Sequence, residues 1–153
     1  MTNDGENGFT LLEMVCVLAL IAMMAAVLLP FIPHQTSRSR LQAYALQTAT
    51  LLKADRNAAI RRGVDVSTLV DTGSRSIRSG ATADMIRIPD DVSFNALLPQ
   101  TCNRRAALST ISFFASGMSC GGAIALTRLD TGYEIRVNWL TGRVEIVPHS
   151  ATN

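Results

Sequence analysis

The polar and apolar positions of this chain divide it into three regions, and the first is almost continuously apolar. Between residues 9 and 32, only Thr10 and Glu13 carry strongly polar side chains. A helix of this length rises about 36 Å, which exceeds the ~30 Å hydrocarbon core of a bilayer. The pattern therefore predicts a membrane-spanning helix over residues 9–33. Because a carboxylate inside such a helix costs roughly 2.5–3.5 kcal/mol, Glu13 is expected to have a partner and a function.

The second region, residues 34–63, changes to an amphipathic pattern with helical spacing. Gly63 is placed to end this helix, as glycine commonly does just past a helix C-terminus. Two residues interrupt the pattern, since Arg56 falls on the apolar stripe and Leu46 on the polar side. We expect a helix that continues the membrane span outward and lays its apolar stripe on a sheet. The stripe consists of Leu41, Ala45, Ala49, Leu52 and Ala59.

The third region, residues 64–153, has the shorter period and the turn residues of a β-structure. The stretches 71–83 and 99–105 are predicted to be loops. A long N-terminal helix, membrane-spanning in its first half and packed on a small antiparallel β-sheet, is an α+β fold. The predicted strands are 64–70, 85–88, 92–97, 111–114, 123–128, 133–138 and 143–147.

Turn sequences separate the last three predicted strands, which favours an antiparallel meander. The first turn is expected at residues 130–132, Asp-Thr-Gly, and the second at Thr141-Gly142. Pro148 is expected to end the final strand, because proline cannot donate to the ladder.

The start of the apolar region carries the most specific motif of the chain, Gly8-Phe9-Thr10-Leu11-Leu12-Glu13-Met14. It resembles the type IV prepilin signature, which pilins and the pseudopilins of type II secretion share. The resemblance implies that a prepilin peptidase cuts after Gly8 and N-methylates Phe9, so that residues 1–8 form a leader. It also implies that Glu13 pairs with the N-terminus of a neighbouring subunit during assembly.

The same resemblance implies a single-pass protein of the bacterial inner membrane, in contact with its lipid, with the globular domain in the periplasm. The charges near the span do not follow the positive-inside rule, since the leader contains Asp4 and Glu6 but no basic residue. Arg38 and Arg40 lie just beyond the apolar region instead. A secretory signal peptide would need a basic n-region. A buried core helix would rarely be apolar on every face, and an anchor that is never processed is a further alternative.

A second pattern, in the C-terminal half, resembles the GspH/FimT group of minor pseudopilins and minor pilins. Residues 63–108 do not match it. The group implies a minor pseudopilin of a type II secretion system, located in the pseudopilus tip with other major and minor pseudopilins as partners. A minor type IV pilin of the FimT kind, serving twitching or DNA uptake, is the alternative. The pattern comprises Phe113-Phe114, Ser116-Gly117, Gly121-Gly122, Tyr133-Glu134-Ile135 and Leu140-Thr141-Gly142-Arg143-Val144.

Charge and cysteine content add two expectations. The chain has 14 basic and 12 acidic residues, with Lys53 the single lysine, and its arginines are scattered, so nucleic acid is not an expected partner. Cys102 and Cys120 would both lie in the oxidising periplasm, where a disulfide between them would contribute roughly 3 kcal/mol. Cys16 is expected to be an apolar filler of the membrane helix.

Residues 117–121 match G-x-S-x-G, the nucleophile elbow of α/β-hydrolases, and Asp130 and His149 follow in the chain order of that fold. An elbow requires a helix directly after Ser119, but a strand-like segment follows. Asp90 and Asp91 form a solvated turn more readily than a calcium site, because no spaced acidic loop surrounds them. We therefore expect no catalytic residue, no metal site, no cofactor and no enzyme activity.

Overall fold

The computed structural model describes residues 10–28 and 36–149 of the chain. Gly8 and Phe9 lie outside the described residues. The chain forms two compact units, residues 1–35 and 36–153. The first contains the helix α1, Leu11–Leu28, whose described side chains are all exposed. Among the described residues, no helix combines the length and apolarity that a membrane crossing requires.

The second unit begins with the helix α2, Arg38–Arg62. It starts four residues after the beginning of the predicted region 34–63 because Ser37 caps it, accepting a hydrogen bond from the Arg40 N–H at 3.3 Å. It ends at Gly63, which adopts φ +66° and donates its N–H to the Ala59 carbonyl. The predicted role of Gly63 is thus confirmed.

The strands form two antiparallel four-stranded sheets and one short hairpin, so the predicted single sheet is divided. One sheet has the order β3-β2-β1-β7, and the other has the order β10-β9-β8-β4. The strands of the first are β1 (Val66–Asp71), β2 (Ser76–Arg78), β3 (Met85–Arg87) and β7 (Thr110–Phe113). Those of the second are β4 (Ser93–Leu97), β8 (Gly122–Arg128), β9 (Thr131–Val137) and β10 (Val144–His149), and the hairpin pairs β5 (Thr101–Cys102) with β6 (Arg105–Ala106).

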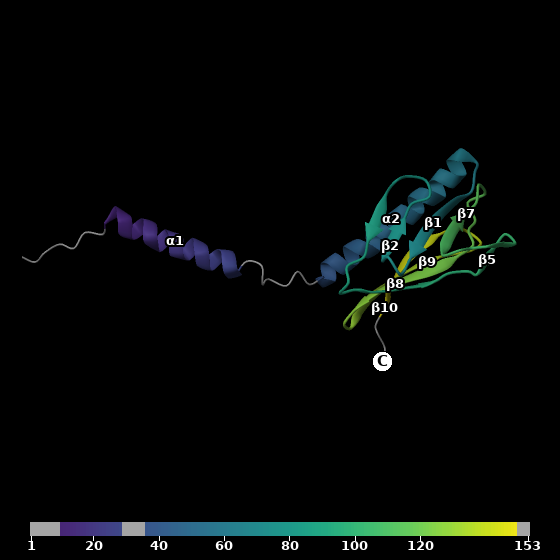
Figure 1. The fold of residues 1–153 in the computed structure, drawn as a ribbon. Coiled ribbons are helices and arrows are strands. Elements are labelled where there is room, and N and C mark those ends of the chain that lie inside the picture. The colour runs from purple at the N-terminus through teal and green to yellow at the C-terminus, as the bar shows by residue number, and fades with distance from the viewer. Residues whose placement is uncertain (1–9, 29–35, 150–153) are drawn as a thin grey trace, which may run out of the picture. The chain divides into compact units, whose positions relative to one another are not determined.

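The helix α2 packs against strands of both sheets, which confirms the α+β architecture (Figure 1). The apolar stripe predicted for this helix is buried, whereas Leu46 on the other face is exposed. The sheets contribute the alternate residues of each strand to the same core. The largest fully buried side chains are Phe113, Leu41, Leu52, Ile77, Ile111, Ile124, Leu126 and Ile135.

The predicted loops hold regular structure that the sequence pattern does not show. The stretch 71–83 contains β2, in which Ile77 is the one buried side chain, and 99–105 contains most of the β5–β6 hairpin. A three-residue strand with one apolar position has no alternation to detect.

The meander β8-β9-β10 is confirmed, but its first turn and its end were predicted wrongly. The turn is Leu129-Asp130, one residue earlier than expected, and Leu129 adopts φ +52°. The strand β10 continues through Pro148, which pairs with Tyr133. The Asn138 N–H donates to the Arg143 carbonyl, and in an antiparallel pair every second residue of a strand bonds its partner in this way. Pro148 is five residues after Arg143, so its nitrogen points away from β9 to the free edge of the sheet, where no N–H donor is needed.

Candidate functional site

Glu13 lies in the first turn of α1, within the part of the motif that the structure describes. Thr10 begins the turn, and its hydroxyl oxygen accepts the Glu13 backbone N–H at 3.3 Å. This is the first half of a capping box. The Glu13 carboxylate is exposed and has no hydrogen bond or ion pair with any residue that the structure describes.

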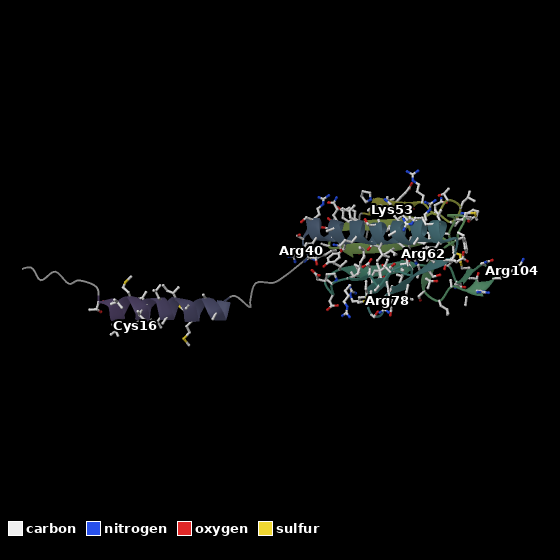
Figure 2. All side chains as sticks on the ribbon, turned by 90° about the horizontal axis from the view of Figure 1, so that it is seen from above. Cys16, Arg40, Lys53, Arg62, Arg78 and Arg104 are labelled. Carbon is white, nitrogen blue, oxygen red and sulfur yellow. A yellow bond between two sulfur atoms is a disulfide. The ribbon has the colours of Figure 1, made fainter. Side chains whose placement is uncertain are left out.

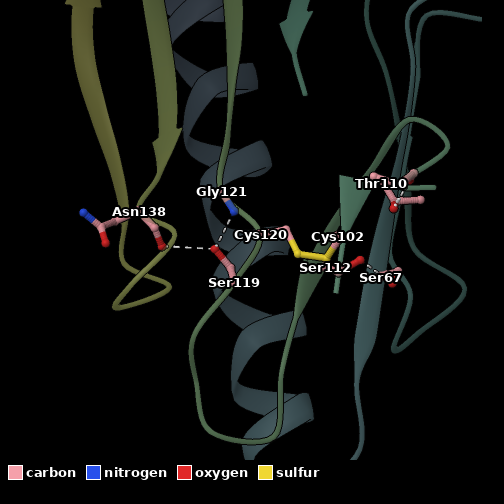
Figure 3. The surroundings of a disulfide bond; sticks show 9 residues. Ser67, Cys102, Thr110, Ser112, Ser119, Cys120, Gly121 and Asn138 are labelled. Carbon is pink, nitrogen blue, oxygen red and sulfur yellow. Dashed lines mark hydrogen bonds between the residues drawn. A yellow bond between two sulfur atoms is a disulfide. The ribbon is translucent and has the colours of Figure 1, made fainter. Parts of the chain in front are cut away.

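The disulfide between Cys102 and Cys120 joins the β5–β6 hairpin to the segment that leads into β8 (Figure 3). The Cα atoms lie 5.6 Å apart, which is the usual separation for a disulfide. The Cys120 N–H also donates to the Ser112 carbonyl in β7 at 3.0 Å. The bond thus holds the hairpin against the junction between the two sheets.

Ser119, the serine of the G-x-S-x-G match, is buried and bonded within the protein (Figure 3). Its hydroxyl donates to the Asn138 carbonyl and accepts the Gly121 N–H, both at 3.0 Å. The strand β8 follows it in place of the helix that a nucleophile elbow needs, and Asp130 lies beyond the far end of that strand. The geometry gives Ser119 a role in closing a turn. The side chain of His149 lies outside the described residues.

Arg56 on α2 clamps two loops that flank β8 and β9. Its Nε donates to the Gly117 carbonyl and its Nη2 to the Thr141 carbonyl, both at 3.0 Å. Gly142 sits against the same clamp with φ +62°, and a Cβ there would lie 2.1 Å from the Gly117 oxygen. Two of the five segments that carry the C-terminal resemblance, 116–117 and 140–144, therefore meet at Arg56. In the sequence pattern, Arg56 only interrupts the apolar stripe of the helix, so these contacts were not predicted.

Asp55, the residue before Arg56, is fully buried and accepts hydrogen bonds from four groups. The donors are the Thr68 hydroxyl on β1 at 2.6 Å, the Ser79 hydroxyl, the Gly80 N–H at 3.0 Å and the Ala81 N–H at 3.3 Å. A buried carboxylate is tolerated only when hydrogen bonds compensate its lost hydration. No sequence signal indicated this site, because its donors are separated from Asp55 along the chain.

Asp91 anchors the chain where it enters the second unit. Its carboxylate accepts the Thr36 N–H at 2.6 Å and the Thr36 hydroxyl at 2.8 Å, and Arg128 Nε lies 3.0 Å from it. These bonds, the Thr36 N–H first, lower the pKa of Asp91 below 3.8. Its carboxylate is thus occupied by protein donors. Within the described ranges, no group of three His, Cys, Asp or Glu residues could hold a metal ion.

Comparison with known proteins agrees with both sequence patterns. Residues 3–29 match the model of the prokaryotic N-terminal methylation motif. The chain is 30% identical over 144 residues to type II secretion system protein H of Xanthomonas campestris pv. campestris, covering 93% of this chain and 83% of the relative. The chain belongs to the type II secretion system protein H family. Its members are GspH-like minor pseudopilins.

Two solved structures share the fold of this protein H family member. The minor pseudopilin EpsH from the Vibrio cholerae type 2 secretion system has a TM-score of 0.57 and 11% sequence identity to this chain. The match covers 71% of this chain and 96% of the EpsH chain. The type IV minor pilin FimU of Pseudomonas aeruginosa matches 74% and 92%, with TM-score 0.56 and 16% identity. At these identities the likeness concerns the fold alone.

Proposed function

We propose that the chain is a minor pseudopilin that joins other major and minor pseudopilins in the tip of a periplasmic pseudopilus, which drives export of folded proteins across the outer membrane. The observation that carries this proposal is the 30% identity to type II secretion system protein H along 83% of that relative. The similarity extends over the soluble region, so it does not rest on the N-terminal motif alone. A tip subunit needs surfaces for its neighbours and no catalytic group.

We propose that residues 1–8 are a leader, that prepilin peptidase cuts after Gly8, and that Phe9 is then N-methylated. The match to the methylation motif supports this processing. Residues 9–33 would form the single inner-membrane span. Residues 34–63 would form a periplasmic helix, followed by the β-structure of residues 64–153. Support comes from the exposed apolar side chains of α1, which need a non-aqueous environment, and from the disulfide, which suits an oxidising compartment.

Cleavage would create a positively charged amine at Phe9, one helical turn from Glu13. We propose that the Glu13 carboxylate pairs with this amine on a neighbouring subunit. Its position in the first turn of α1 and its lack of a partner among the described residues support this role. A partner in trans would also remove the insertion cost of an isolated carboxylate.

The test compares Glu13→Ala, Glu13→Gln and Glu13→Asp in cells that contain the other pseudopilins. All three should be cut after Gly8, as intact mass would show. The Ala and Gln variants should lose co-purification with the other pseudopilins, whereas the Asp variant should keep part of it because it retains the charge. Normal assembly of the Gln variant would contradict charge pairing. An uncut leader in unsubstituted protein would favour the unprocessed anchor.

A minor type IV pilin is the second candidate, because FimU shares the fold. A deletion strain separates the two functions. Exoproteins that accumulate in the periplasm while motility stays intact would establish the secretion role. Lost twitching or transformation with a normal set of secreted proteins would assign the chain to the pilus machinery.

A further inference from the structure

Two arginines in the first turn of α2 have no bonded side-chain partner among the residues that the structure describes. Arg38 and Arg40 are exposed, and neither guanidinium has an ion pair or hydrogen bond with the residues that the structure describes. Cations are unfavourable at a helix N-terminus, where the helix dipole is positive. Figure 2 shows Arg40 at the end of this unit where the chain enters, and Arg104 at the opposite end. These charges therefore suit an anionic partner outside the chain.

An exposed apolar side chain lies beside Arg38. Leu129, in the β8–β9 turn, is 78% exposed and lines a hollow of about 280 Å³ together with Ser37 and Arg38. Its φ of +52° is a conformation that leucine rarely adopts and asparagine tolerates well. Segments that bind a membrane surface combine apolar side chains with Lys and Arg, and Leu129 beside Arg38 offers the same two kinds of group.

This end of the unit is held as one piece. Thr36 and the β8–β9 turn are tied through Asp91, which binds Thr36 and Arg128. Three acids lie at or near this end: Asp91 has its bonds within the protein, Asp90 faces Arg75 at 3.4 Å, and Asp130 adjoins Leu129 in the turn. Arg38 and Arg40 still leave an excess of positive charge here.

In the sequence, this end of the unit follows directly on the proposed membrane span. Thr36 begins the second unit three residues after the end of the span proposed for residues 9–33. Under the proposed anchoring, this end is therefore the part of the unit that comes first after the bilayer.

We propose that this end of the unit rests on the membrane, with Leu129 inserted between lipid headgroups and with Arg38 and Arg40 bound to the phosphates of anionic lipids. The inference rests on the proposed membrane anchoring of α1. The positive-inside rule disfavours Arg38 and Arg40 on the periplasmic side of the membrane. The proposed contact gives them anionic lipids as binding partners on that side. Before assembly, the contact would fix the orientation of the domain on the bilayer.

The test uses the full-length chain in vesicles with or without anionic phosphatidylglycerol, and lipids carrying a spin label on the headgroup. In a Cys16→Ser background, a fluorophore is attached at Thr131→Cys, close to Leu129, or at Leu140→Cys, beyond the other end of β9. We expect headgroup quenching at residue 131 to exceed that at residue 140 by about twofold or more in anionic vesicles. Equal quenching at both positions would overturn the proposal.

Variants then separate the two parts of the contact. Leu129→Asn, which suits the turn, and Arg38→Gln with Arg40→Gln should each lower quenching at residue 131 to the level at residue 140. Arg104→Gln with Arg105→Gln, at the opposite end of the unit, should change nothing. Raising NaCl from ~0.01 to ~1 M shortens the Debye length from about 30 to 3 Å and should act like loss of Arg38 and Arg40. Quenching at residue 131 that stays unchanged at high salt and in the Arg38→Gln, Arg40→Gln variant would refute lipid-phosphate binding.

A label on the native Cys16 distinguishes failure of the inference from failure of the proposed function. Cys16 is exposed on α1, and a lipid with its spin label deep in the acyl chains should quench it. Strong quenching at Cys16 without quenching at residue 131 would contradict the surface contact but leave the proposed membrane anchor intact. No quenching at Cys16 would refute the anchor as well. Protection of residue 131 that appears only with other pseudopilins would make a neighbouring subunit the partner and overturn the lipid contact.

Discussion

Asp55 and Arg56 are consecutive residues of α2, yet they fasten the helix to different parts of the β-structure. Neighbouring helical positions point about 100° apart. The buried Asp55 therefore bonds β1 and the segment after β2, whereas the half-buried Arg56 reaches the loops before β8 and after β9. The acid holds the helix from inside the core, and the arginine holds it from the rim. A buried polar group depends entirely on its partners, while one at the rim can exchange them for water.

Replacing Asp55 with alanine should produce the largest loss of stability. The substitution leaves two hydroxyls and two amide N–H groups without their acceptor, so we expect the free energy of unfolding to fall by about 3–5 kcal/mol. Urea unfolding of the full chain in mild detergent, followed by the fluorescence of Trp139, the single tryptophan, measures it. Asp55→Asn keeps one acceptor oxygen and should lose less. A loss below about 1 kcal/mol for the alanine variant would contradict the role of this carboxylate.

Arg56→Ala should cost less, about 1.5–3 kcal/mol, because the freed Gly117 and Thr141 carbonyls gain access to water. Arg61→Ala is the matched control, since Arg61 is exposed on the same helix and makes no bond to the described residues. Equal unfolding curves for the two variants would show that the rim clamp contributes nothing. A loss as large as that of Asp55→Ala would remove the distinction between core and rim.

The sequence allowed a prediction of the elements that depend on local pattern. The buried stripe of α2, its end at Gly63 and the β8–β9–β10 meander all follow from periodicity and turn residues. The Asp55 and Arg56 contacts could not be found this way. Their partners lie 13–26 and 61–85 residues further along the chain, and an acid or arginine in a helix normally indicates a solvated face. Leu129 was missed because leucine carries no turn signal.

Acid should weaken the contact at Asp91 in a defined direction. Its pKa is lowered in the folded protein, chiefly by the Thr36 N–H, so the unfolded chain takes up a proton first. The stabilisation is therefore complete above the unfolded pKa of ~3.9 and is lost as the pH falls through the lower folded value. Asp91→Asn should flatten the decline of stability between about pH 5 and 3, measured by urea titrations.

Asp71 provides the control for this pH effect. Its pKa is also lowered, chiefly by the N–H of Ser74, three residues away. Because so local a turn can persist in the unfolded chain, Asp71→Asn should change the acid response less than Asp91→Asn. An equal change would mean that the anchoring of Thr36 is not what acid disrupts.

The smallest effect is expected at Thr48. Together with Thr68, it allows a buried hydroxyl without a hydrogen-bond partner to be compared with one that has a partner. Thr48 and Thr68 are both fully buried, but the Thr68 hydroxyl donates to Asp55, while the Thr48 hydroxyl has no partner in the described structure. Thr48→Val should raise the free energy of unfolding by about 0.5–1 kcal/mol, and Thr68→Val should lower it by about 1–3 kcal/mol. The shape of the side chain is nearly the same in both substitutions, so opposite signs would isolate the hydrogen bond to Asp55. Destabilisation of equal size at both sites would instead mean that packing, and not the acceptor on α2, decides what a buried hydroxyl contributes.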